Sequence, residues 1–113
     1  MNWIDLTKES QLIDIIEQSK NKPQLIFKHS TRCAVSGVAK NRLERSVPPG
    51  NVDFYFLDLI KNRGISTKIA EDFSVYHESP QVLLIKNGEC IYDESHSGIN
   101  MKDIEEQVLN LKP

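Results

Sequence analysis

The chain has 113 residues, of which 39% are hydrophobic and 27% charged, a balance typical of a soluble domain with one ordinary core. A formal net charge of −2 gives no electrostatic reason to expect nucleic acid or a membrane surface as a partner. Apolar runs stay far below the ~20 residues that span a bilayer, and the start MNWIDLTKES lacks the pattern of a secretory signal. We therefore expect one domain, residues 1–113, in the cytoplasm.

Helical and strand patterns alternate along the chain. In chain order they predict a helix at Lys8–Ser19, a strand at Gln24–Lys28, a helix at Ala34–Arg45, a strand at Val52–Leu59, a helix at Ser66–Phe73, strands at Gln81–Lys86 and Cys90–Ser95, and a last helix containing Met101 to Leu111. Thr7 and Asn100 are the expected N-caps of the first and last helices. The pattern also allows a small strand around Trp3 and Ile4.

The order of these elements predicts the fold class. Asn87-Gly88 between two strand patterns is a strong hairpin signal because both residues tolerate positive φ. The hairpin makes one strand pair antiparallel, whereas the helical connections before it favour parallel strands. We expect an α/β, thioredoxin-like fold with a central mixed β-sheet flanked by helices on both faces.

Cys33 lies in the segment HSTRCAVSG, between a predicted strand and a predicted helix. At a helix start, free backbone N–H groups and the helix dipole favour thiolate over thiol. Arg32 adds a permanent positive charge, and Lys28 and His29 lie close in sequence. Thiolate is the form that attacks disulfides. We therefore interpret Cys33 as a reactive cysteine rather than the small buried thiol that free cysteines commonly are.

Ser36 stands where a C-x-x-C motif has its second cysteine. A hydroxyl cannot form a disulfide, so Cys33 would have to act as a monothiol. Two roles for Ser36 remain open: a hydrogen bond to the Cys33 thiolate across one helical turn, or a bond to the backbone in the first turn of the helix.

Pro80 directly precedes a predicted strand. About 5–6% of X–Pro bonds in folded proteins are cis, and a cis bond here would offer the backbone of Ser79 to an extended substrate. The position relative to the Cys33 helix supports a cis bond, and a trans proline that only opens the strand stays open as the alternative.

The other cysteine and histidines carry weaker signals. Cys90 is expected to be a structural thiol, with a peripheral resolving role as the minority alternative. His77 and His96 lie in turn patterns and are expected at the surface. The cysteines and histidines show no paired ligand spacing, so we expect no metal site. A cysteine phosphatase would need arginine at the position of Ala39, which excludes that activity.

Four segments, FKHSTRCAVS, DFYFLD, HESPQVLLI and KNG, resemble the monothiol bacilliredoxins, the YtxJ-like branch of the thioredoxin superfamily. The resemblance covers roughly residues 4 to 110 by the order of elements. Its specific part is the Cys-x-x-Ser site after the H-S-T loop, combined with Ser-Pro before the strand. The family pattern is commonly T-C-P-x-S, whereas here Arg32 precedes the cysteine and Ala34 follows it. This departure bears on substrate preference more than on the redox role.

The resemblance implies a thiol–disulfide oxidoreductase that removes bacillithiol, or a similar small thiol, from mixed disulfides with protein cysteines. It implies Cys33 as the nucleophile and Ser36 in place of the resolving cysteine. The expected substrate-binding residues are Thr31, Arg32, Ala34, Ser79 and Pro80. The expected partners are S-thiolated client proteins and the small thiol as co-substrate, with a monomeric protein and no tightly bound cofactor.

Two other classes remain open. Monothiol glutaredoxins with a Cys-x-x-Ser site hold a 2Fe–2S cluster between two subunits, and the sequence is compatible with such an iron–sulfur carrier. The other class is a non-catalytic binding module, in which Cys33 is vestigial and the Ser79-Pro80 edge grips extended peptides.

Overall fold

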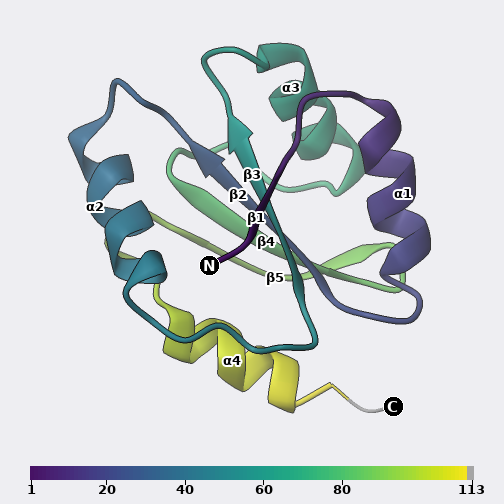
Figure 1. Cartoon of the computed structure of the whole chain (residues 1–113). Coiled ribbons are helices and arrows are strands. Elements are labelled where there is room, and N and C mark those ends of the chain that lie inside the picture. Colours follow the sequence, from purple (N-terminus) through teal and green to yellow (C-terminus); the bar gives the residue numbers. More distant parts are fainter. Residues whose placement is uncertain (112–113) are drawn as a thin grey trace.

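A computed structural model describes residues 1–111, in which a five-stranded sheet lies between two layers of helices (Figure 1). The elements in chain order are β1 (Trp3–Asp5), α1 (Ser10–Gln18), β2 (Gln24–His29), α2 (Ala34–Glu44), β3 (Asp53–Asp58), α3 (Arg63–Asp72), β4 (Gln81–Lys86), β5 (Glu89–Ser95), a 3-10 turn (His96–Gly98) and α4 (Met101–Leu109). Positions 112 and 113 of the expected domain lie outside the described residues.

The sheet has the strand order β1-β3-β2-β4-β5. Strands β1 and β2 run parallel to β3, whereas β4 runs antiparallel to both β2 and β5. Asn87 and Gly88 form the β4–β5 turn with φ values of 53° and 76°, as the hairpin signal required. The predicted mixed sheet with helices on both faces is confirmed.

Strand β2 is buried along its whole length and separates two hydrophobic cores. Leu25 and Phe27 belong to the core beneath α2 and α4, while Ile26 belongs to the core beneath α1 and α3 (Figure 1). Because side chains alternate along a strand, the next two residues also point to opposite faces of the sheet. Lys28 faces the α3 side, and His29 faces α2.

The start of α1 differs from the prediction. The helix begins at Ser10, and its N-cap residue is Glu9 rather than Thr7. The side chain of Gln11 explains the difference, since its Oε1 accepts hydrogen bonds from Thr7 N at 2.8 Å and Lys8 N at 3.0 Å. The free amides before the helix are therefore satisfied by a residue inside it.

Other boundaries shift slightly. Helix α3 begins at Arg63 instead of Ser66, and α4 ends at Leu109 instead of Leu111. The predicted cap of α4 is confirmed, because Asn100 Oδ1 accepts a hydrogen bond from Asp103 N at 2.9 Å. Within residues 1–111, no helix has the length and apolar character needed to cross a membrane.

Candidate active site around Cys33

Cys33 is the N-cap residue of α2, at the end of a tight loop that follows β2. Its backbone N donates to Ser30 O at 3.2 Å, and its own carbonyl accepts from Gly37 N at 3.2 Å. The Cys33 side chain makes no capping hydrogen bond and is half-exposed. The loop therefore holds the sulfur at a helix N-terminus, where free backbone N–H groups favour a negative charge.

Ser36 is fully buried one turn into α2 and is anchored to the end of β2. Its Oγ accepts a hydrogen bond from Ser30 N at 3.0 Å and lies 2.7 Å from His29 Nδ1. Because the oxygen already accepts from Ser30, we assign the hydroxyl hydrogen to His29 Nδ1. Of the two open roles for Ser36, the structure shows the bond to the backbone, together with a bond to the His29 ring. The hydroxyl does not bond to Cys33 Sγ.

His29 is a site residue whose role was missed from the sequence. The residue is 7% exposed, and its ring lies 5.8 Å from the Phe27 ring and 5.2 Å from the Phe56 ring, centroid to centroid. Burial, followed by the charge of Lys40, lowers the pKa of His29 below its ordinary value. At neutral pH, His29 is therefore a neutral hydrogen-bond partner of Ser36 and not a cation beside Cys33. The available signal was its spacing of two residues from Phe27, which places both side chains on the same face of β2.

Lys28 lies on the opposite face of the sheet from His29. Its side chain is fully buried, and Nζ lies 3.2 Å from His77 Nδ1. Burial lowers the pKa of Lys28 to about 8. The exposed ring of His77 thus covers a buried amine and also lies 3.4 Å from Ser66 Oγ. His77 is exposed as predicted, in a loop rather than a turn, and the sequence gave no sign of these contacts.

The Ser79–Pro80 peptide bond is cis. Pro80 is buried and Ser79 is half-exposed, and Pro80 O accepts a hydrogen bond from His96 N at 3.1 Å. Gln81 pairs with Lys28 across β2 and β4, so the Ser79–Pro80 segment lies at the edge of the sheet where the Cys33 loop leaves β2. Ser79 Oγ is buried without a hydrogen-bond partner among residues 1–111. The fold thus brings the two predicted parts of the site to one edge.

The remaining predicted contact residues surround Cys33. Thr31, Arg32 and Ala34 are exposed. Within the described part of the chain, Arg32 forms no ion pair, so its charge is available to solvent or a ligand. Thr31 and Arg32 therefore make the chain just before Cys33 polar and cationic, whereas Ala34 adds a small apolar side chain.

Cys90 lies at the other end of the sheet. It pairs with Ile85, four residues along β4 from Gln81, which corresponds to about 13 Å at ~3.3 Å per residue. Its Sγ donates to Tyr92 O at 3.3 Å, and burial raises the pKa of the thiol to about 11. This placement favours the structural role of Cys90 over direct attack on an adduct of Cys33.

A family model described as "Monothiol bacilliredoxin BrxC" matches residues 4–104. Among solved structures, a protein with a thioredoxin fold and a suggested oxidoreductase activity is 31% identical, with 91% of this chain and 90% of that chain covered and a TM-score of 0.77. Thioredoxin from Fasciola hepatica (19% identity, 96% and 98% covered, TM-score 0.71) and thioredoxin from Malassezia sympodialis (17%, 96% and 89%, 0.72) share the fold. Since the family model matches most of the sequence and the fold agrees with it, this chain belongs to the monothiol bacilliredoxin family of thioredoxin-fold proteins.

Proposed function

We propose that this protein is a monothiol thiol–disulfide oxidoreductase that removes bacillithiol, or a similar small thiol, from protein mixed disulfides. One observation carries the proposal: the Cys33 side chain is half-exposed at the N-cap of α2, while Ser36, in the position of a second thiol, is buried and bonded to the end of β2. Family membership and fold support redox chemistry at this site.

The first step is attack of the Cys33 thiolate on the small-thiol sulfur of the mixed disulfide. The bond between that sulfur and the client sulfur breaks, and the client cysteine leaves as a thiolate. Cys33 is then disulfide-bonded to the small thiol. A second molecule of small thiol attacks this adduct, which releases Cys33 thiolate and the oxidised small-thiol dimer.

The geometry supports a second thiol from outside the protein. Ser36 has no sulfur, and Cys90 lies about 13 Å along β4 from the edge that carries the Cys33 loop. We propose that Thr31, Arg32 and Ala34 contact the mixed disulfide, while the half-exposed Ser79 and the adjoining Pro80 contact the client chain. The proposal also includes a cytoplasmic monomer without a tightly bound cofactor.

The test is release of bacillithiol from a client protein that carries it on one cysteine, followed by intact mass. Cys33→Ser is expected to abolish release, and Cys90→Ser to keep most of it. Equal release by the Cys33→Ser variant would overturn the proposal. A visible absorption band in the purified protein that disappears in Cys33→Ser would instead favour an iron–sulfur carrier.

Oxidised bacillithiol, oxidised glutathione and coenzyme A disulfide, incubated separately with the reduced protein, identify the preferred thiol. We expect the Cys33 adduct to form fastest with one of the three. If none of the three disulfides forms an adduct with Cys33, the catalytic role is contradicted.

A further inference from the structure

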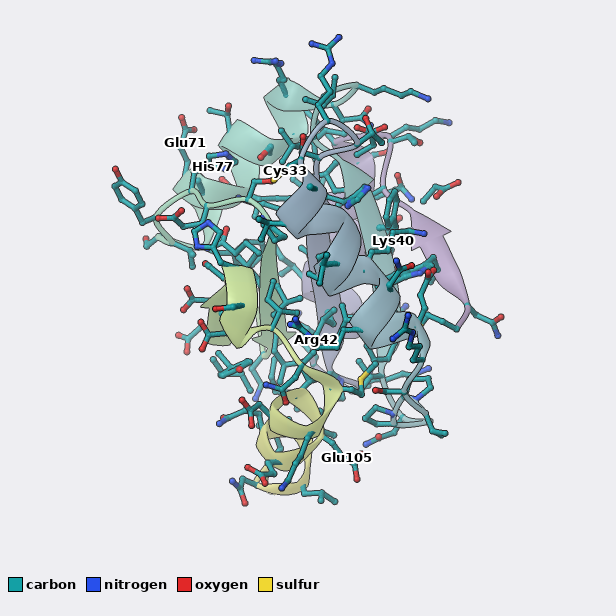
Figure 2. All side chains as sticks on the ribbon, turned by 90° about the vertical axis from the view of Figure 1, so that its left-hand side faces the viewer. Cys33, Lys40, Arg42, Glu71, His77 and Glu105 are labelled. Atoms are coloured by element: carbon teal, nitrogen blue, oxygen red, sulfur yellow. The ribbon has the colours of Figure 1, made fainter. Side chains whose placement is uncertain are left out.

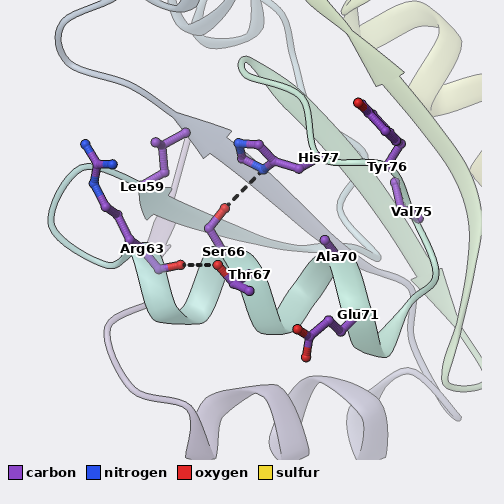
Figure 3. Close-up of a pocket in the computed structure, with 9 residues that line it drawn as sticks. All are labelled: Leu59, Arg63, Ser66, Thr67, Ala70, Glu71, Val75, Tyr76 and His77. Atoms are coloured by element: carbon purple, nitrogen blue, oxygen red, sulfur yellow. Dashed lines mark hydrogen bonds between the residues drawn. The ribbon is translucent and has the colours of Figure 1, made fainter.

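A cavity of about 560 Å³ lies between α3 and the segment that leads to Ser79–Pro80. Figure 3 shows Leu59, Arg63, Ser66 and His77 at one end of this cavity, and Glu71 and Tyr76 toward the other. The end lined by Arg63 and His77 offers hydrogen-bond donors and the positive charge of Arg63, whereas Glu71 makes the other end negative.

The donor-rich end of the cavity adjoins the strand end from which the Cys33 loop leaves. Leu59 N donates to His29 O at 3.0 Å, and His77 Nδ1 lies 3.2 Å from Lys28 Nζ. Both cavity residues therefore contact the last two residues of β2, and the chain reaches Cys33 after one tight turn. Figure 2 shows Cys33 and His77 at the same end of the molecule.

A positive charge lies beneath this end of the cavity without a carboxylate to neutralise it. Lys28 is fully buried, and within residues 1–111 its Nζ forms no ion pair; its contact is the His77 imidazole. An uncompensated buried cation is costly, and a nearby anion lowers that cost. The exposed guanidinium of Arg63 likewise has no ion pair in the described structure.

The hydrogen bonds of His77 leave one donor available. The Lys28 ammonium only donates, so His77 Nδ1 accepts and the proton of the neutral ring is assigned to Nε2. Figure 3 shows this second ring nitrogen turned toward Leu59 and Arg63. A carboxylate between Arg63 and His77 would receive two donors and lie close to the Lys28 charge.

We propose that this cavity binds a carboxylate of the small thiol exchanged at Cys33, with Arg63 and His77 as donors and Lys28 as the buried counter-charge. The inference rests on the proposed function and specifies its substrate class: low-molecular-weight thiols that carry a carboxylate. The guanidinium provides the planar pair of donors that matches such a group.

The test compares the rates at which oxidised glutathione and its tetraethyl ester form the Cys33 adduct, by intact mass. Each rate is divided by that of 2-mercaptoethanol, an uncharged thiol, with the same disulfide, which removes intrinsic reactivity. We expect the normalised acid-to-ester ratio to be about five or more, the preference expected for one charge-assisted contact at a half-open site. Arg63→Gln should reduce this ratio about fivefold.

Lys68→Gln is the matched control, because Lys68 lies on the same helix and pairs with Asp72 instead of lining the cavity. It should leave the ratio unchanged. Lys28→Met, which removes the buried charge with little change in volume, should lower the ratio as Arg63→Gln does.

The outcomes separate the two proposals. If neither of these disulfides nor oxidised bacillithiol forms an adduct with Cys33, the proposed function itself fails. If adducts form but the normalised ratio is near one, or if Arg63→Gln leaves it unchanged, the carboxylate site is wrong while the oxidoreductase remains. A ratio that falls in Arg32→Gln but not in Arg63→Gln assigns the preference to the Cys33 loop and overturns the inference.

Discussion

Replacing Ser36 with alanine tests whether the buried hydroxyl holds the start of α2 against β2. In the native protein, Ser36 Oγ accepts from Ser30 N at 3.0 Å and bonds to His29 Nδ1 at 2.7 Å. Ser36 is 0% exposed and Ser30 is 8% exposed, so water has little access to replace the lost oxygen. The substitution therefore leaves one buried donor and one buried acceptor without their partner.

The expected cost follows from these two groups. A buried polar group that loses its partner costs about 1–3 kcal/mol, so the two groups together are expected to lower the free energy of unfolding of Ser36→Ala by about 2–6 kcal/mol. That is a large share of the ~5–15 kcal/mol that stabilises a typical domain. For a chain of this size, a loss of 1 kcal/mol lowers Tm by about 4 °C, so the expected fall in Tm is about 8–25 °C. We also expect slower formation of the Cys33 adduct, because Ser30 anchors the loop.

Urea unfolding of the variants gives the free energies. Ser46→Ala is the matched control: Ser46 lies just after α2, is half-exposed, and donates to Arg42 O at 3.3 Å. We expect this control to change stability by no more than about 0.5 kcal/mol. A Ser36→Ala cost below about 1 kcal/mol, or one no larger than that of Ser46→Ala, would refute the anchoring role.

The other predictions concern titration and burial. Burial lowers the pKa of His29 and His77 below the ordinary 6.5, so the unfolded chain binds more protons near that pH and stability should fall as the pH drops below about 6.5. Urea unfolding at about pH 7.5 and about pH 5.5 measures this fall in stability. His29→Gln should make the fall smaller, and an unchanged fall would exclude His29 as a source. Since burial lowers the pKa of Lys28 to about 8, its charged form opposes folding at neutral pH. Lys28→Met should therefore raise the free energy of unfolding at neutral pH by about 1 kcal/mol or more. A loss of stability in this variant would contradict the prediction. With a pKa raised to about 11 by burial, Cys90 should react with iodoacetamide far more slowly than Cys33 at about pH 8 in peptide mass mapping, and equal rates would contradict the raised pKa.

Local sequence signals were enough for most of the fold. Apolar runs bounded by loop residues marked β2 and β4, and the positive φ values that Asn87-Gly88 tolerate placed the hairpin. The helix after Cys33 begins at Ala34, where its apolar spacing begins. The prediction of Thr7 as the N-cap of α1 was wrong because Gln11, a residue inside the helix, satisfies the amides of Thr7 and Lys8.

The contacts of the candidate site depend on pairings far apart in sequence. Lys28 meets His77 across 49 positions because β2 pairs with β4 and the loop before β4 folds over the strand end. No local pattern at either residue reports this contact. The bond between His29 and Ser36 spans only seven positions, but it requires the strand, the loop and the helix to be placed first. The position of Cys33 at a helix start was therefore predictable from local sequence, whereas its supporting contacts were not.

The order of Lys28 and His29 assigns two different tasks to adjacent residues. Alternation along β2 turns His29 toward Ser36 and the α2 core, and turns Lys28 toward α3 and His77. A shift of one residue would turn the Lys28 amine toward Phe56 and the helix that carries the sulfur, and turn the His29 ring away from Ser36. The end of β2 thus anchors the start of the helix that follows Cys33 on one face and places an uncompensated positive charge on the other. On this view, the same strand end that positions Cys33 also sets which small thiols it prefers.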